Sequence, residues 1–452
     1  MERRQFLKAS AAAPFVLTAQ QAARRPNVIL VVADDLGYGD LGCYGQKRIQ
    51  TPHIDRLAAE GMRFTQAYAG STVCGPSRCA LFTGLHSGHG RMRGNRETWL
   101  KPEDFTLGQM FQQAGYQTGL FGKWSLGGIG TDGHPNKKGF DEFFGYFSQM
   151  QAHLYYPQML LHNQQEVNLP GNWGTSRKQY AHDLITDRAL GWLDKVQGPF
   201  FTHIAWTIPH ANNELGRDTG NGMEVPSDEP YTSQAWPQVE KNFAAMVTRM
   251  DRDMGRLMDL LKRRGLDRDT LVLFTSDNGP HKEGGHDAEF FQSGGPLRGT
   301  KRDLYDGGIR VPAIARMPGY VPAGQASDFV WAFWDVLPTC AELAGQRVAA
   351  GLDGQSVTRA LRGEAQQAHE YLYWEFHERG FDQGVRHQDW KAVRKGLKGK
   401  LELYDVKNDV GERNDVAARH PEVVQRIERY LAGARSESAD YPVREAGPGK
   451  RG

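Results

Sequence analysis

Two continuous apolar runs constrain the fold of this chain more than any other feature. Residues 27–33 (NVILVVA) and 270–275 (TLVLFT) are rich in β-branched side chains and lack the polar alternation of a half-exposed strand. Such runs are typical of strands that are buried on both faces of a parallel sheet. Residues 117–121, 200–206 and 311–316 are three further strand candidates.

Helical periods lie between these predicted strands. Apolar residues from Phe243 to Leu261 follow the three- and four-residue spacing of a long amphipathic helix, and shorter helices are predicted over 54–60 and 106–114. Alternating strands and helices predict an α/β fold with a mostly parallel sheet sandwiched by helices. After about residue 345 short alternating stretches such as 371–376 and 390–394 predict a smaller C-terminal α+β subdomain with an antiparallel sheet.

The N-terminus has the features of an export signal. Arg3 and Arg4 precede Phe6, Leu7 and Lys8, and a short, weakly apolar stretch follows. This pattern resembles a twin-arginine signal peptide, and the stretch is shorter than the ~18 apolar residues that a membrane span requires. We therefore predict a periplasmic or secreted protein with the following segments: signal peptide 1–23, catalytic domain 24–345, C-terminal subdomain 346–435 and disordered tail 436–452.

Charge and cysteine content exclude several classes of function. The formal net charge of +2 resides in the predicted leader, which leaves a neutral mature chain. A neutral chain gives no electrostatic reason to expect nucleic acid or an anionic membrane as partner. The four cysteines include no CxxC spacing, so neither a disulfide framework nor a zinc cluster is indicated.

Polar residues follow the two buried runs directly. Asp34 and Asp35 come after the first run, and Asp277 and Asn278 come after the second. The carboxyl ends of parallel strands form sites at one edge of the sheet, so these four side chains are expected to meet there. Their hard oxygen atoms suit Ca²⁺, or Mg²⁺ as the second choice. An isolated Asp-Asp pair is about as often a turn or a helix cap.

The segment from Cys74 to Gly84 (CGPSRCALFTG) carries the sharpest signal. It resembles the signature of the sulfatase family, in which a dedicated enzyme oxidises the cysteine to formylglycine. The alternative is a structural cysteine near a proline-containing turn, because short motifs also occur by chance. The resemblance extends over about residues 26–415, and it implies an alkaline-phosphatase-like fold and a calcium ion at Asp34, Asp35, Asp277 and Asn278.

Basic residues within longer motif matches complete the implied site. The resemblance assigns catalytic or sulfate-binding roles to Arg78, Lys123, His210 and Lys301. Positive side chains placed before reaction stabilise the negative charge that spreads over a sulfuryl group in transfer. Each of these residues alone would more often be an ordinary surface residue.

One position departs from the family pattern. Gly122-Lys123-Trp124 is followed by Ser125, where many sulfatases have a histidine that contacts the hydrated aldehyde. Some members with this variant carry a Gln-Ala-His-x-Tyr-Tyr-Pro segment, which is present here around His153. We hypothesise that His153 replaces the lost histidine; the alternative is that it binds substrate or packs in a loop. The residues with predicted substrate contacts are His281, His377 and Arg93.

The sequence therefore predicts a sulfuric ester hydrolase that acts on a sulfated carbohydrate, of galactose or N-acetylgalactosamine type. Formylglycine at Cys74 would require a formylglycine-generating enzyme as partner before export. Two alternatives stay open: a phosphonate or phosphate ester hydrolase of the same superfamily, and a non-catalytic glycan-binding protein. Ser125 is the only residue that supports the last alternative.

Overall fold

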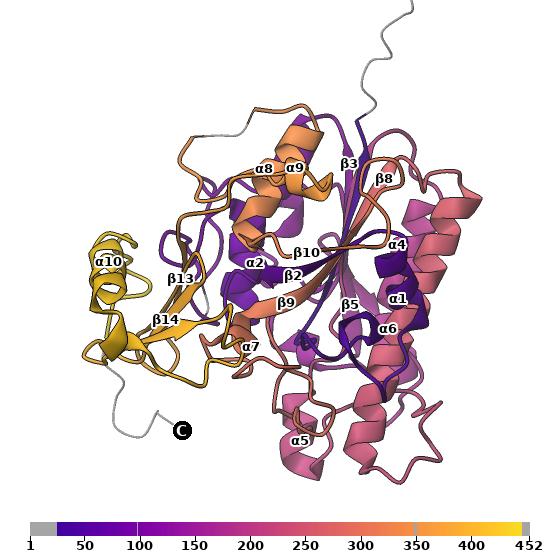
Figure 1. The fold of residues 1–452 in the computed structure, drawn as a ribbon. Helices are drawn as coiled ribbons and strands as arrows, with labels where there is room; N and C mark the ends of the chain where they lie inside the picture. The colour runs from indigo at the N-terminus through magenta and orange to yellow at the C-terminus, as the bar shows by residue number, and fades with distance from the viewer. Residues whose placement is uncertain (1–24, 97, 348–349, 445–452) are drawn as a thin grey trace, which may run out of the picture.

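Two β-sheets of unequal size organise the chain in a computed structural model that describes residues 25–96, 98–347 and 350–444 (Figure 1). The larger sheet has eleven strands in the order β10-β2-β9-β8-β1-β7-β3-β4-β5-β6, with β11 paired to β2. Its strands are β1 Asn27–Ala33, β2 Met62–Tyr68, β3 Gln117–Gly122, β4 Glu142–Gly145, β5 Met159–His162, β6 Gln165–Asn168, β7 Phe200–Ala205, β8 Thr270–Ser276, β9 Arg310–Arg316, β10 Gln325–Ser327 and β11 Trp331–Ala332.

The centre of this sheet is parallel and completely buried. β1 pairs in parallel with β8 on one side and with β7 on the other, and β7 pairs in parallel with β3. Every residue of β1 and β8 is buried, as their uninterrupted apolar sequences predict. β9 departs from the parallel arrangement because it runs antiparallel to both β8 and β2.

Helices cover both faces of the large sheet (Figure 1). The long helix α6 packs with α1 and α4 over one face, and α2, α3 and α8 contact one another over the other. The helices are α1 Pro52–Ala59, α2 Cys74–Thr83, α3 Leu107–Gln113, α4 Ala181–Leu193, α5 Asn213–Thr219, α6 Gln238–Arg263, α7 Asp306–Ile309, α8 Val336–Leu343, α9 Thr358–Leu361 and α10 Pro421–Leu431. The predicted sandwich of helices around a mostly parallel sheet is confirmed.

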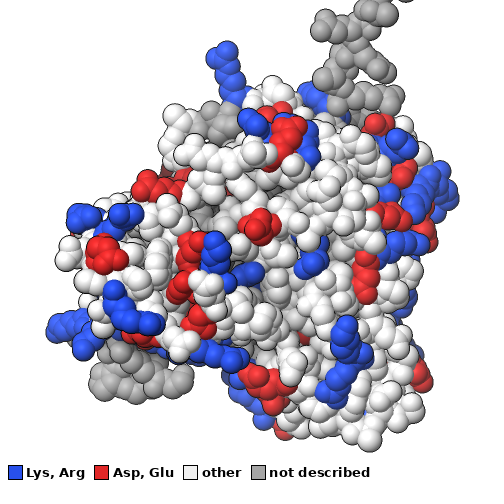
Figure 2. Space-filling model, in the orientation of Figure 1, with Lys and Arg blue, Asp and Glu red and all other residues white. Residues whose placement is uncertain are grey.

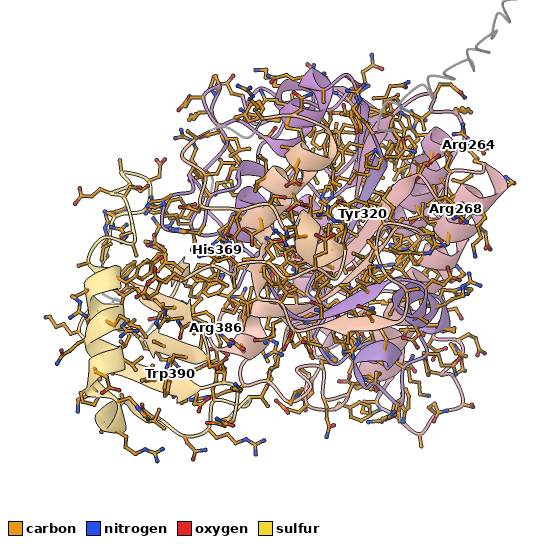
Figure 3. The ribbon with its side chains drawn as sticks, turned by 45° about the horizontal axis from the view of Figure 1, so that its top comes forward. Arg264, Arg268, Tyr320, His369, Arg386 and Trp390 are labelled. Carbon is orange, nitrogen blue, oxygen red and sulfur yellow. The ribbon has the colours of Figure 1, made fainter. Side chains whose placement is uncertain are left out.

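The smaller sheet is antiparallel and belongs to the C-terminal part of the chain. Its strands, in spatial order, are β12 Leu372–Phe376, β13 Asp382–His387, β14 Trp390–Arg394 and β15 Leu401–Asp405. Arg386 of β13 lies where the two sheets approach each other (Figure 3), and it donates hydrogen bonds to Tyr68 Oη at 3.3 Å and to Gln66 Oε1 at 2.9 Å. The small sheet is thus fixed to the large one by polar contacts to β2.

The C-terminal residues correct one prediction. We expected disorder from residue 436 onward, but residues 436–444 are described, and the part up to Tyr441 packs against the loop that follows α2. Tyr441 is completely buried and donates a hydrogen bond to Gly94 O at 2.9 Å. We predicted disorder from the polar composition of this segment and did not consider that one aromatic side chain, Tyr441, could anchor it. The remaining tail and the predicted signal peptide, 1–23, lie outside the described residues.

Basic and acidic side chains are interspersed on the face that Figure 2 shows. Among the helices of the described ranges, none combines the length and the apolar character that a bilayer crossing needs.

Candidate active site

Strand register brings the two acidic pairs together. Ala33 of β1 pairs with Ser276 of β8, so Asp34 and Asp277 are adjacent at the edge where both strands end. The Asp35 amide donates to Asp277 Oδ1 at 3.2 Å, and Asn278 Nδ2 donates to Asp35 Oδ1 at 2.7 Å. All four predicted metal ligands are completely buried. Their convergence follows from the parallel pairing of strands that lie 240 residues apart in the chain.

Cys74 is the first residue of α2 and lies beside these carboxylates. Its Sγ donates to Asp34 Oδ1 at 3.2 Å, and burial raises the pKa of its thiol well above the ordinary value. The unmodified thiol is therefore a poor nucleophile at neutral pH. Pro76 lies in the first turn of this helix, where its lack of an N–H carries little penalty.

Arg78 lies one helical turn after Cys74 and joins the acidic groups. Its Nε and Nη2 approach Asp277 Oδ2 at 3.0 and 2.8 Å, and its Nη1 donates to Lys123 O at 2.7 Å. The side chains of Arg78 and Asp277 are 1 % and 0 % exposed. A buried pair of this kind persists when both charges are held by further hydrogen bonds, as they are here.

Lys123 follows β3 and points to the same carboxylate as Cys74. Its Nζ contacts Asp34 Oδ2 at 2.5 Å, and its side chain is 1 % exposed. Burial opposes ionisation of Asp34, but the charge of Lys123 in particular holds the pKa of that carboxyl below its usual range. The preceding Gly122 has φ +112°, and a Cβ there would stand 2.0 Å from Ala205 O, so only glycine permits this approach of β3 to β7.

Lys301 and His210 both contact Asp35, the second carboxylate of the first acidic pair. Lys301 Nζ donates to Asp35 Oδ2 at 2.8 Å and lies 3.2 Å from His210 Nε2. Lys301 reaches this edge because β9 is antiparallel, so the segment before its first residue lies beside the ends of β1 and β8. The contacts fix the tautomer of His210, whose Nδ1 donates to Ala211 O at 2.7 Å and whose Nε2 accepts from Lys301. Burial and the Lys301 charge lower the pKa of His210 to about 3, so the ring is neutral.

The arrangement fits a hard divalent cation. Asn278 Oδ1 is buried and has no hydrogen-bond partner among the described residues, although it stands among three carboxylates. Burial and the neighbouring Asp34 charge raise the pKa of Asp277 to about 7, because two adjacent buried carboxylates repel each other. A cation bound by these oxygens would satisfy the amide and remove that repulsion.

His153 lies next to His210, a residue of this site. Its ring is nearly parallel to that of His210, and its Nδ1 donates to Glu214 Oε2 at 3.2 Å. Burial and the charge of Lys123 lower the pKa of His153. Ser125 donates to Gln149 Oε1 instead of turning toward Cys74. The structure therefore places a neutral histidine with an unprotonated Nε2 near the cationic residues.

The three residues that were predicted to contact the substrate form hydrogen bonds or ion pairs with other groups of the protein. His281 is completely buried; its Nε2 donates to Pro209 O at 3.0 Å and its Nδ1 accepts from the Glu283 amide at 3.1 Å. Arg93 is 2 % exposed and pairs with Glu375 Oε1 at 3.0 Å, and His377 Nε2 bonds the same oxygen at 2.9 Å. Arg93 and His377 therefore belong to a buried network, and His281 contacts the His210 loop; direct contact of these three residues with substrate stays a prediction.

Two acidic residues of the site were missed by sequence reasoning. Glu283 Oε2 accepts from Lys301 Nζ at 3.0 Å, and its other oxygen accepts from Arg302. Glu214 of α5 is the partner of His153. Glu283 lies five residues after Asn278 and could have been suspected on that ground, whereas α5 is a short polar helix without any distinguishing pattern.

Comparisons with known proteins agree with this geometry. Residues 26–346 match the sulfatase family model, and residues 299–437 match the model described as N-sulphoglucosamine sulphohydrolase, C-terminal. Arylsulfatase A of Homo sapiens is 30% identical over 90% of this chain and 87% of its own. N-acetylgalactosamine-6-O-sulfatase of Bacteroides thetaiotaomicron is 28% identical over 92% of this chain and 94% of its own.

Solved structures extend the likeness to the fold. The crystal structure of Ps i-CgsB superposes with a TM-score of 0.78 at 30% identity, over 90% of this chain and 92% of that one. Its complex with k-i-k-neocarrahexaose gives a TM-score of 0.79 at 28% identity, over 93% and 95% of the two chains. Fold and site together define a hydrolase with the alkaline-phosphatase-like α/β architecture. The chain belongs to the sulfatase family, and it is an enzyme that hydrolyses sulfate esters.

Proposed function

We propose that the protein removes sulfate from a sulfated carbohydrate with a formylglycine formed from Cys74 and a calcium ion. The observation that carries this proposal is the contact of Cys74 Sγ with Asp34 Oδ1 at 3.2 Å, in a site where Lys123 holds the other oxygen of that carboxylate. Cys74 is the residue that the modification would convert, so the oxygen atoms of formylglycine would be formed beside Asp34. Asp34, Asp35, Asp277 and Asn278 are the residues that would hold the ion.

Each absent group supplies one kind of chemistry. The ion would lower the free energy of negative oxygens near position 74. The hydrated aldehyde offers one hydroxyl that attacks sulfur, with departure of the sugar alcohol, and a second hydroxyl whose deprotonation expels sulfate and restores the carbonyl. Calcium is preferred to a transition metal because the proposed ligands are oxygen atoms of carboxylates and one amide.

The cationic residues bind and orient the sulfuryl group in this proposal. Lys123 contacts Asp34 and Lys301 contacts Asp35, so in this proposal the two lysines bind different sulfate oxygens. Positive charges fixed before reaction stabilise the transition state without reorganisation. Arg78 holds Asp277 and the Lys123 carbonyl, which keeps both elements in register with Cys74.

His153 moves the proton in this scheme, and Glu214 orients it. The Glu214 contact places the proton of the neutral ring on Nδ1, so Nε2 can accept a proton from a hydroxyl at position 74. This role requires that the substrate-free ring be neutral near pH 7, and the lowered pKa of His153 meets that requirement.

The relatives support a carbohydrate substrate. The Bacteroides thetaiotaomicron relative is named for N-acetylgalactosamine-6-O-sulfate, and the Ps i-CgsB structure was solved with a carrahexaose. We infer a sulfated sugar of galactose or N-acetylgalactosamine type. We also propose export by the twin-arginine route, after a formylglycine-generating enzyme has acted on Cys74.

Two measurements test the proposed function. Mass spectrometry of the Cys74 peptide from the native host is expected to find sulfur and two hydrogens replaced by one oxygen; a persistent thiol in fully active protein contradicts the mechanism.

Turnover of matched sulfate and phosphate esters of one sugar is expected to favour the sulfate ester. A preference for phosphate or phosphonate would support the alternative hydrolase, and tight binding without turnover by the modified, calcium-loaded protein would support a glycan-binding protein.

A further inference from the structure

A separate cavity of about 260 Å³ lies between the loop after Lys301 and the small C-terminal sheet. Arg302 lines it from the large domain, and Arg379 and Lys395 line it from the connections that flank β13 and β14. The cavity is thus formed by two parts of the chain that are far apart in sequence. None of these three basic residues was assigned a role by motif.

The cavity carries an excess of positive charge. Its other charged lining residues are Asp303 and Asp382, and each has an oxygen occupied by a backbone amide. Asp303 Oδ2 accepts from the Thr300 amide at 3.0 Å, and Asp382 Oδ1 accepts from the Gly396 amide at 2.7 Å. The lining thus holds three positive and two negative formal charges, and the charge of Arg302 is paired with Glu283 outside the cavity.

Two of the cations are available to a ligand. Lys395 is exposed, and its Nζ stands over the Tyr305 ring at 4.8 Å, a contact that leaves the hydrogens of the ammonium group free for an anion. The Arg379 side chain is half-buried at the end of the β12–β13 connection. An arginine fork and an ammonium group that line the same cavity are donors that suit sulfate and carboxylate groups.

Arg302 connects this cavity to the candidate active site. It forms an ion pair with Glu283, which in turn accepts from Lys301 Nζ at 3.0 Å, and its amide donates to Thr72 O at 3.1 Å, two residues before Cys74. A second contact runs from Arg302 Nε to Glu378 Oε2 at 3.6 Å. Arg302 thus links the lining of this cavity to Lys301 through Glu283.

We propose that this cavity is a subsite for a second anionic group of the substrate, a sulfate ester or a uronate carboxylate on the sugar next to the one that is cleaved. Its volume lies below the roughly 300–1,000 Å³ of sites that enclose a drug-sized ligand, and it suits one charged sugar unit. The inference rests on the proposed function, and it narrows the substrate class to saccharides with more than one acidic group.

Binding without turnover tests this proposal independently of catalysis. In a Cys74→Ala background with calcium present, calorimetry compares a monosulfated galactose disaccharide with its disulfated counterpart and with a counterpart whose second acid is a uronate. The disulfated or the uronate compound is expected to bind about tenfold more tightly than the monosulfated one, as a charge-assisted contact implies. Whichever of the two gains affinity identifies the source of the second charge.

Substitution locates the effect. Lys395→Gln and Arg379→Gln are each expected to remove most of the tenfold preference and to leave the monosulfated compound within twofold of its original affinity. Lys400→Gln is the matched control, because Lys400 is exposed on the same β14–β15 connection but does not line the cavity. Equal affinity for all three compounds, or a preference that survives both substitutions, overturns the subsite. Failure of the proposed function would instead be seen as absent turnover of every compound by the modified wild-type protein.

Discussion

The ring of His153 lies nearly parallel to that of His210, with centroids 4.9 Å apart and an interplanar angle of 20°. His210 is neutral and bonded through both nitrogens, so it cannot readily take up a further proton. His153 has only its Nδ1 engaged, by Glu214. Of two stacked histidines, the one contributed by the 3₁₀ turn Gln151–His153 is therefore the better candidate for proton transfer.

His153→Ala is expected to lower kcat by about 10²–10⁴-fold, the usual contribution of a general acid or base. His162→Ala is the control, because His162 lies on β5 and pairs with Glu142. Steady-state kinetics with a small sulfate ester measures both. If kcat and its pH dependence stay unchanged in His153→Ala, His153 has no catalytic role.

Glu214→Gln is expected to shift the acid limb of the kcat profile to lower pH. Burial and Lys123 lower the pKa of His153, whereas the Glu214 charge raises it. Removal of that charge therefore lowers the pKa further, so the ring stays unprotonated, and competent as a base, to lower pH. Asp218→Asn, which removes an exposed negative charge on the same helix, should leave the profile in place. An acid limb that moves to higher pH in Glu214→Gln would contradict this assignment.

Calcium is expected to stabilise the fold through Asp277 and Asn278. At 100 times its Kd the ion should raise the free energy of unfolding by about 2.7 kcal/mol, which thermal unfolding detects as a higher Tm that chelation reverses. Asp277→Asn and Asn278→Ala should abolish this calcium-dependent rise. Asp228→Asn makes the same charge change at a partly exposed acid outside the site and should retain the rise. A calcium effect of equal size in all variants would place the ion elsewhere.

Much of the fold could be predicted from the sequence because its signals are local. The run 27–33 coincides with β1, and 270–275 lies within β8, since continuous apolar β-branched residues leave few alternatives. The direction of β9 could not be predicted in the same way. Its sequence is equally apolar, and only pairing with β8 and β2 decides that it runs antiparallel.

The candidate site shows the same division. Asp34, Asp277, Cys74 and the basic residues were predicted because motifs carry them, and the structure brings them into contact. Glu214 and Glu283 were missed because a partner is chosen by tertiary geometry and leaves no spacing in the sequence. The ion pair of Arg93 with the buried Glu375 was missed for the same reason, since a polar loop residue gives no sign of its partner.

Cys74→Ser is expected to release at most one molecule of product alcohol per molecule of enzyme. The serine oxygen can displace the alcohol and form a sulfate ester, but it has no second hydroxyl whose deprotonation would expel sulfate. Intact-mass measurement should find the sulfated serine. Cys79→Ser is the control, because Cys79 is a buried thiol on the same helix that no proposed step uses. Sustained turnover by Cys74→Ser would contradict the need for formylglycine.

Arg93→Ala is expected to destabilise the fold while sparing catalysis on small esters. Burial opposes the charge of Glu375, but bonds from His377 and Arg93 lower the pKa of that carboxyl to about 2, so it is ionised at neutral pH. Loss of a partner from a buried ion pair costs about 3–5 kcal/mol, and Arg435 at 2.9 Å should limit the loss to the lower end. Urea unfolding measures this difference. Arg91→Ala, which removes a more exposed pair with Asp104, should cost about 1 kcal/mol or less.

The stability that Glu375 contributes also depends on pH, because its pKa is lower in the folded state than in the unfolded state. This contribution is fully present above the unfolded-state pKa and is lost as pH falls toward 2. A large rise in KM for small sulfate esters in Arg93→Ala, with an unchanged free energy of unfolding, would instead indicate that Arg93 contacts the substrate.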